Sequence, residues 1–69
     1  MNVERIGTWA GLVWNALSNA NTAGVKQLKK ATKLKDKEIF AAIGWLAREN
    51  KITLQPCEDD DKEIIITLI

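Results

Sequence analysis

Apolar positions in residues 2–20 recur at spacings of three and four, which predicts a helix with a buried face. The stripe consists of Val3, Ile6, Ala10, Val13, Trp14 and Leu17. At about 100° per residue, the apolar arc also takes in Trp9, Leu12, Ala16 and Ala20. A surface helix needs a narrower arc than this. The helix is therefore either wrapped by its own domain, or its flank at Trp9 and Leu12 meets a second subunit.

A second, shorter helix is expected over residues 25–33, after a loop at residues 18–24 in which Thr22 and Ala23 can form a short strand. One face of this helix holds Val25, Leu28, Ala31 and Thr32, and the lysines occupy the other. A turn at residues 33–35 follows. Lys35 as N-cap would place Glu38 at N3 and pair Leu34 with Ile39 in a hydrophobic staple. Because lysine is a poor N-cap, Asp36 is an alternative.

The pattern of residues 36–50 predicts a third helix that buries Ile39, Phe40, Ile43, Leu46 and Ala47. Its outward arc holds Lys37, Glu38, Ala41, Ala42, Gly44, Trp45, Arg48 and Glu49. A glycine inside a helix costs about 1 kcal/mol relative to alanine. We therefore expect another element to approach closely at Gly44.

Two strands are expected after this helix. Residues 52–55 alternate in polarity, and Pro56 should end this strand because proline cannot donate to the ladder. Residues 57–62 form an acidic connection, and residues 63–69 form the return strand. The return strand is apolar on both faces, with Ile65 and Ile69 opposite Ile64, Ile66 and Leu68. A half-exposed antiparallel strand would alternate with polar residues, so we expect a second subunit to cover it.

Composition strengthens the expectation of a partner subunit. The 69 residues allow one domain, residues 1–69, which would bury only about 60% of its extended surface. One cysteine and no histidine exclude an internal disulfide and a structural zinc site. We therefore predict a homodimer. Its interface would include Trp9, Leu12, Ala16, Ile65 and Ile69.

The same inventory argues against several classes of protein. No apolar run approaches the roughly 18 residues of a membrane span, and the N-terminus does not resemble a signal peptide. With a free thiol, these features predict a cytoplasmic protein. The sequence lacks histidine and any nucleophile beside a base, and its acidic run does not have the pattern of a calcium loop. We expect no enzyme activity, cofactor, metal or small-molecule ligand.

The segments Gln27-Leu28-Lys29-Lys30-Ala31-Thr32-Lys33-Leu34 and 39–52 resemble the second helix, turn and third helix of the winged helix-turn-helix superfamily. More narrowly, the chain is similar to small stand-alone prokaryotic winged helix proteins of uncharacterised function, in which a Trp-Leu-Ala-Arg-Glu segment leads into the wing. The resemblance implies a mainly α fold, with three helices and a small antiparallel β wing of two or three strands. Most of the superfamily binds double-stranded DNA, often as dimers, whereas some members bind RNA or proteins.

The chain departs from the superfamily pattern at two places. Lys33 stands at a turn position where the superfamily often has glycine, which suits a tight backbone conformation. The wing tip, which is usually neutral or basic in DNA-binding members, is Glu58-Asp59-Asp60-Asp61. This acidic run would repel phosphate.

The resemblance and the lysines together predict a DNA-binding protein that acts as a transcriptional regulator. Six lysines lie within residues 26–37, and they form either a solvated face or a phosphate-binding patch. The predicted phosphate contacts are Lys26, Lys29, Lys30, Lys33 and Lys35. The predicted exposed face of the third helix is Lys37, Ala41, Trp45 and Arg48, which offers few groups for reading base edges. Binding would therefore be driven by phosphates and weakened by salt.

The alternative is a protein-interaction or dimerisation module on the same scaffold. Ala41, Ala42 and Gly44 leave a shallow surface beside Trp45. An exposed tryptophan suits an interaction hot spot, although Trp45 can instead pack under the wing strands. The acidic tip would steer a basic partner.

Overall fold

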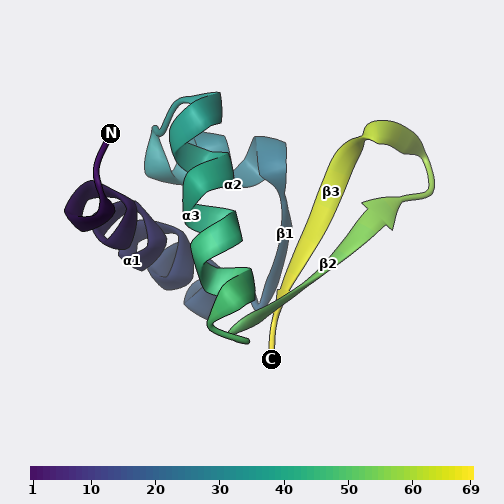
Figure 1. Ribbon diagram of the computed structural model, residues 1–69. Coiled ribbons are helices and arrows are strands. Elements are labelled where there is room, and N and C mark those ends of the chain that lie inside the picture. Colours follow the sequence, from purple (N-terminus) through teal and green to yellow (C-terminus); the bar gives the residue numbers. More distant parts are fainter.

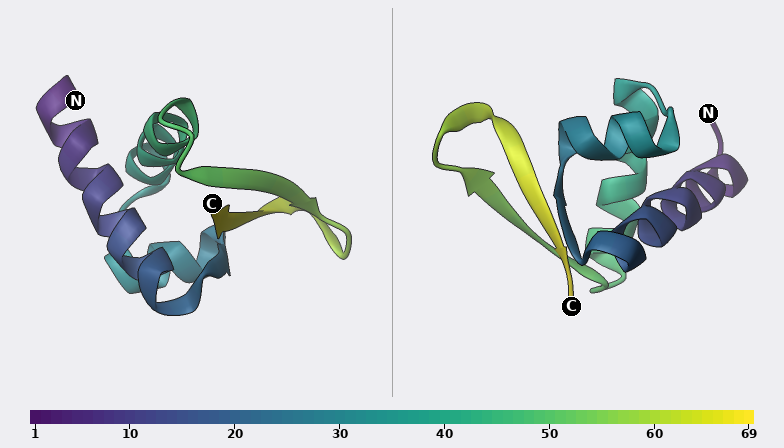
Figure 2. Two further views of the ribbon diagram at one scale, coloured as in Figure 1. Left: turned by 90° about the horizontal axis from the view of Figure 1, so that it is seen from below. Right: turned by 180° about the vertical axis from the view of Figure 1, so that it is seen from behind.

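The computed structural model describes residues 1–60 and 63–69. In this part of the chain the elements follow the order α1 (Val3–Ala20), β1 (Thr22–Gly24), α2 (Val25–Thr32), α3 (Asp36–Arg48), β2 (Ile52–Cys57) and β3 (Asp60–Leu68). The three strands form an antiparallel sheet in the order β1-β3-β2. The helices gather on one side of the molecule (Figure 1), and the β2–β3 hairpin extends away from them (Figure 2).

The first helix has an asparagine at each end, and the one at its start caps it with a side chain. The side chain of Asn2 accepts a hydrogen bond from the backbone N–H of Arg5 at 2.8 Å. The helix ends at Asn21, whose φ of 68° is a left-handed conformation that asparagine tolerates. Trp9 is only 9% exposed and belongs to the domain's own core. The side chain of Trp9 is therefore covered by its own domain, and the subunit contact expected there stays a prediction.

The start of α2 depends on a residue from β3. The short strand expected at Thr22 and Ala23 is confirmed, and it extends to Gly24. Gly24 is the N-cap of α2 and supplies no capping side chain, so the backbone N–H of Val25 donates instead to Oε1 of Glu63, at 3.0 Å. A Cβ at Gly24 would lie 2.9 Å from Oε2 of Glu63. Glycine therefore leaves the room that this carboxylate needs beside the positive end of the helix.

The turn between α2 and α3 has the conformation expected of a glycine position. Lys33 adopts a φ of 62° and a ψ of 21°, and its N–H donates to the carbonyl of Lys29 at 2.8 Å. Of the two alternatives for the N-cap of α3, Lys35 and Asp36, the structure has Lys35. Its backbone N–H donates to Oε1 of Glu38 at 2.8 Å. The lysine side chain has no acceptor, so only the Glu38 half of a capping box is formed.

The core lies where the helices meet the central strand. The largest fully buried side chains come from α1, α2, α3 and β3, and they are Val13, Leu17, Leu28, Ile39 and Ile66. From α3 the buried set is Ile39, Ala42, Ile43 and Leu46, spaced three and four apart. Phe40 is 50% exposed, so the prediction that it is buried is wrong, as is the outward placement of Ala42. Phe40 lies about 100° round the helix from Ile39 and outside the narrow stripe that faces the core.

The hairpin is longer and tighter than the sequence predicted. Strand β2 continues through Pro56 to Cys57, so the prediction that Pro56 ends it is wrong. Because β2 is an edge strand, a residue without an N–H is tolerated there. Cys57 pairs with Asp60 across a turn at residues 58–59, after a register shift at Pro56 and Cys57. The predicted connection at residues 57–62 is therefore shorter, and its members Asp61 and Lys62 lie outside the described residues.

The return strand is the middle strand of the sheet, which explains much of its apolar character. On one face Ile66 is fully buried, and Ile64 and Leu68 pack partly against the core. On the other face Ile65 is half-buried, and its strand neighbours are Gly24 and Gln55. Ile69 follows the end of the strand and is exposed. The proposed subunit contact at Ile65 and Ile69 stays a prediction.

Replacing Glu63 with alanine should lower the free energy of unfolding by about 1 kcal/mol, because the first N–H of α2 loses its acceptor. Urea unfolding followed by circular dichroism measures this change. Glu63→Gln keeps an acceptor and should lose less. Glu58→Ala, at an exposed position in the hairpin turn, is the matched control and should change little. Equal effects at positions 58 and 63 would contradict the capping role.

Replacing Lys33 with glycine should raise the free energy of unfolding by about 0.5–1 kcal/mol. The left-handed conformation costs a side-chain-bearing residue about 1–2 kcal/mol, and the greater flexibility of glycine offsets part of the gain. Asn50→Gly is the comparison, because Asn50 has a similar φ of 59°. Asparagine tolerates this conformation better than lysine, so the gain there should be smaller. A loss of thermal stability in Lys33→Gly would show that the lysine side chain itself stabilises the turn.

Candidate functional site

The structure divides the lysines predicted to contact phosphate into two groups. Lys26 pairs with Asp60 of the hairpin at 3.3 Å, and Lys29 forms an ion pair with Asp36 at the start of α3. These four side chains remain substantially exposed, so each pair contributes little stability. Both pairs nevertheless neutralise a lysine charge. A phosphate would have to displace a carboxylate to reach either lysine.

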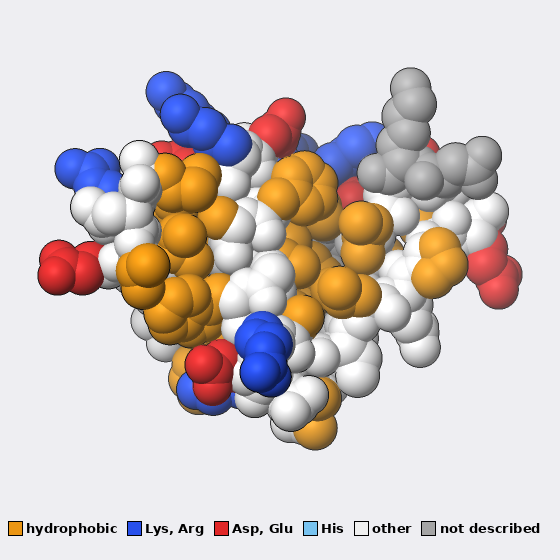
Figure 3. Space-filling model, in the orientation of Figure 1, with side chains coloured by type: hydrophobic (Ala, Val, Ile, Leu, Met, Phe, Trp, Pro, Cys, Tyr) orange, Lys and Arg blue, Asp and Glu red, His pale blue; other side chains and the backbone are white. Residues whose placement is uncertain are grey.

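The second group is Lys30, Lys33, Lys35 and Lys37, which we call the lysine edge. All four residues are exposed, and none forms an ion pair with any residue that the structure describes. They come from the last turn of α2, the connecting turn and the first turn of α3. Figure 3 shows basic side chains extending from the edge of the molecule where α3 begins. Positive charge is therefore concentrated at one end of a chain whose net charge is only +1.

The exposed face of α3 is mainly apolar. Phe40 and Trp45 are both exposed, the latter by 36%, while Ala41 is only half-exposed. Lys37 and Arg48 are exposed as predicted, at opposite ends of the helix. In Figure 3, hydrophobic side chains spread across this face from α1 to the hairpin. Few groups on the face can donate to or accept from a base edge.

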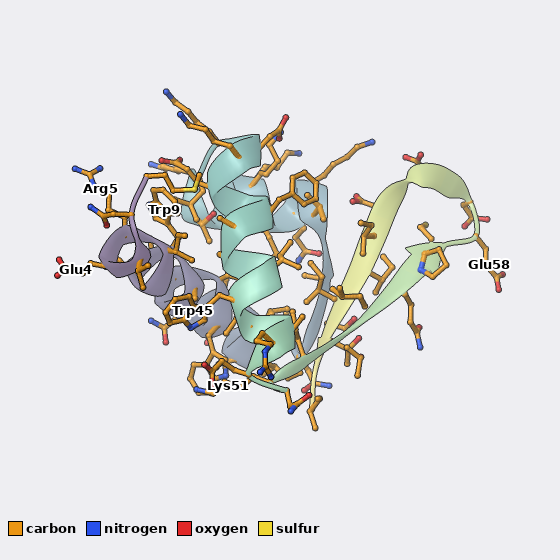
Figure 4. The ribbon with its side chains drawn as sticks, in the orientation of Figure 1. Glu4, Arg5, Trp9, Trp45, Lys51 and Glu58 are labelled. Atoms are coloured by element: carbon orange, nitrogen blue, oxygen red, sulfur yellow. The ribbon has the colours of Figure 1, made fainter. Side chains whose placement is uncertain are left out.

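Trp45 lies beside α1, and not under the hairpin strands as one interpretation of the sequence held. Its Cζ2 atom is 3.9 Å from the position that a Cβ on Gly7 would occupy. Figure 4 shows Trp45 between α3 and α1. The absence of a side chain at Gly7 lets the indole ring approach the backbone of α1. The sequence offered a ring that is exposed or a ring that packs under the wing strands. In the structure the ring packs on α1 and is still partly exposed, so it corresponds to neither alternative completely.

An open cleft of about 280 Å³ lies between α1 and the C-terminal half of α3. It is lined by Gly7, Ala10, Gly11, Trp14, Asn15, Trp45, Leu46 and Lys51. Sequence reasoning missed it. The signal was present in the two glycines spaced four apart, which place a strip without side chains along one face of α1.

Two kinds of site have no support in the part of the chain that the structure describes. No group of three or more histidine, cysteine, aspartate or glutamate side chains there could hold a metal ion. Within the same residues, no helix is both long enough and apolar enough to cross a membrane.

Comparison with known proteins decides the family. The model of a family described as "Winged helix-turn-helix domain (DUF2582)" matches residues 1–68. The chain belongs to this winged helix-turn-helix family. Its structure is similar to the solution NMR structure of protein BT2368 from Bacteroides thetaiotaomicron, with a TM-score of 0.82 and 32% sequence identity. The match covers 99% of this chain and 79% of that chain. No curated protein matches this chain significantly.

The winged helix fold expected from the sequence is confirmed. In this winged helix fold, α2 and α3 form the helix-turn-helix, and the β2–β3 hairpin is the wing. The wing turn carries Glu58 and Asp59, and Glu58 lies at the far end of the hairpin from α1 (Figure 4). Asp60 is turned toward α2 through its contact with Lys26. Asp61, the last member of the predicted acidic tip, lies outside the described residues.

Gly44 faces open space in the winged helix domain. Nothing lies within 4 Å of the position that a Cβ would occupy there, so the expected close approach of another element is wrong. The residue lies on the solvent side of α3. The structure gives no packing reason for a glycine at this position.

Gly44→Ala should therefore raise the free energy of unfolding by about 1 kcal/mol, the difference in helix propensity between the two residues. Chemical denaturation measures it. Gly24→Ala is the contrasting variant and should be destabilising, because the added Cβ displaces the Glu63 carboxylate. Destabilisation by alanine at position 44 would mean that the exposed backbone there has a contact partner.

Proposed function

We propose that this winged helix domain binds duplex DNA with little sequence preference, through phosphate contacts from the lysine edge. One observation carries the proposal: Lys30, Lys33, Lys35 and Lys37 are exposed at one end of the helix-turn-helix without a carboxylate partner among the described residues. Lysine ammonium groups that neutralise phosphates release counterions, and this release supplies most of the affinity in non-specific binding.

The charge distribution favours one orientation on the duplex. Glu58 and Asp59 lie in the wing turn, and Glu58 projects from the far end of the hairpin (Figure 4). Contact through the lysine edge would place the phosphates on the helical side of the molecule, to one side of the acidic wing turn (Figure 1). An approach that laid the wing tip on the backbone would bring these carboxylates against like charge. The proposal thus differs from the arrangement in which the wing contacts the DNA backbone.

Sequence discrimination should be weak because of what α3 exposes. Specific readout uses arginine, lysine, asparagine or glutamine side chains that reach base edges. Phe40, Gly44 and Trp45 occupy the middle of the exposed face, where none of these groups is available. A role in transcription would then require specificity from elsewhere, such as DNA shape or a second protein.

Titration of a labelled random-sequence duplex by fluorescence anisotropy, over a range of salt concentrations, tests the proposal. With about four phosphates neutralised, log affinity should fall with log salt at a slope of about −3.6. This slope corresponds to a loss of about 100-fold between 50 and 200 mM salt. The double variant Lys33→Gln/Lys35→Gln should reduce the steepness of the slope by about 2.

The matched control is Arg5→Gln/Lys51→Gln, which removes the same charge from residues outside the lysine edge and should leave the slope unchanged. Lys26→Gln/Lys29→Gln should have an intermediate effect, because these lysines already have carboxylate partners. Equal slopes for the wild type and Lys33→Gln/Lys35→Gln would overturn the proposal. So would an absence of binding by the wild type at low salt.

A second candidate function is protein interaction, and the exposure of Phe40 favours it. A large aromatic side chain half-exposed at the centre of a helix face is the kind of residue that anchors interfaces. Backbone amide shifts, measured by NMR as the same duplex is added to the protein, separate the two candidates. Shifts confined to residues 30–37 support DNA contact at the lysine edge. If no amide shifts with duplex at low salt, protein interaction becomes the better account.

A further inference from the structure

Residues 6–25 contain no charged side chain, although 28% of the whole chain is charged. Most of this stretch is α1, and a helix with a face in water normally carries charged residues there. The uncharged exposed flank includes Gly11, Trp14, Asn15 and Ser18. Trp14 is 42% exposed. A flank without charged residues is typical of a surface that packs against another element. Within the described part of the chain, however, no element packs against it.

This flank holds both a projection and a hollow. The projection is Trp14, and the hollow is the cleft above Gly7 and Gly11, where nothing lies within 4 Å of a Cβ built on Gly11. Trp14 is three residues from Gly11, which is about 4.5 Å along the helix axis. The two features therefore lie side by side on adjacent turns of one helix.

We propose that two copies of this chain pair through α1 in antiparallel orientation, with Trp14 of each copy filling the cleft of the other. A twofold axis beside α1, between Gly11 and Trp14, places each tryptophan above the other copy's Gly11. Such an interface is isologous, because the same patch supplies the projection and the hollow on both sides. The glycines also let the two helix backbones approach closely, toward the short end of the usual 8–10 Å interaxial range.

The charges around the cleft favour a second copy over a charged partner. Lys51 is the one charged residue in the cleft lining, and it is exposed, so its ammonium can remain in water at the rim. The groups that the second copy brings, Trp14 and Asn15, are neutral. Because residues 6–25 carry no charge, pairing along this part of α1 opposes no like charges between the two helices.

The available area indicates a weak dimer. A standard interface buries about 800 Å² per partner, which is about one sixth of this chain's 4838 Å² surface. Because the proposed contact uses one helix flank and the rim at Trp45, we expect it to bury less than that. We therefore expect association of the small, transient class, with a dissociation constant on the order of micromolar or weaker.

The proposed interface differs from the one predicted from the sequence. Trp9 lies in the core, and Ala16 is partly buried against it. Leu12 is exposed, but it lies about 160° round the helix from Trp14 and so on the other flank. Leu12 therefore provides a control position that tests which flank is used.

Analytical ultracentrifugation across a concentration series tests the proposal on the full chain. The wild type should show a monomer–dimer equilibrium. Gly11→Gln should weaken association at least tenfold, because its side chain occupies the hollow. The same variant should fold with a higher Tm, because the site has open space in the monomer and glutamine favours helix. This combination separates loss of pairing from loss of folding.

Trp14→Gln should also give monomers, whereas Leu12→Gln should associate like the wild type. A wild type that remains monomeric at concentrations of several hundred micromolar would overturn the proposal. Dissociation by Leu12→Gln without dissociation by Gly11→Gln would also overturn it and assign the contact to the opposite flank. None of these variants alters the lysine edge, so DNA binding and pairing can fail independently.

Discussion

The packing of Ile66 against the helices is the contact on which the rest of the structure depends. This fully buried side chain lies on the middle strand, and Ala23 of β1 and Leu54 of β2 pair with it across the sheet. On the helical side the core is completed by Val13, Leu17, Leu28 and Ile39. A chain of 69 residues can bury only one small core. Each element therefore contributes a narrow buried stripe, and apolar residues outside those stripes remain on the surface.

This limit explains why the surface carries so many large apolar side chains. Phe40, Trp14 and Leu54 are each more than two-fifths exposed, although residues of these types are usually found inside proteins. On α3 the stripe that faces the core begins at Ile39, so its neighbour Phe40 is left outside. The cleft between α1 and α3 arises in a similar way, because Gly7 and Gly11 have no side chains to fill the space beside Trp45. The same shortage of core makes a second copy a physically reasonable way to cover the α1 flank.

The lysines of the helix-turn-helix differ in whether they have a carboxylate partner. Lys26 and Lys29 are engaged by Asp60 and Asp36, contacts that join α2 to the wing and to α3. The lysine edge is the remaining region of positive charge that a ligand can approach. The two proposed surfaces do not share a residue, since one is neutral and lies on α1 while the other lies at the helix-turn-helix. Association with DNA and pairing of copies can therefore occur on the same molecule.

The sequence by itself determined the kind of fold and the location of its elements. Periodicities of three and four placed the helices to within a few residues, and the staple and N3 glutamate limited the N-cap of α3 to Lys35 or Asp36. These features depend on contacts within a few residues along the chain, so they can be read locally. The sequence also showed the charges of residues 26–37, but it did not show which of these charges form ion pairs.

Only the tertiary structure decided the features that depend on distant parts of the chain. The pairing of Lys26 with Asp60, and the capping of α2 by Glu63, join residues more than 30 positions apart. The exposure of Phe40 and the burial of Trp9 depend on how far each helix is rotated toward the core. Adjacent positions on a helix differ by about 100°, so a small rotation moves a side chain from the core to the surface. Sequence periodicity measures the width of an apolar stripe, whereas the packing of neighbouring elements sets which part of that stripe is covered.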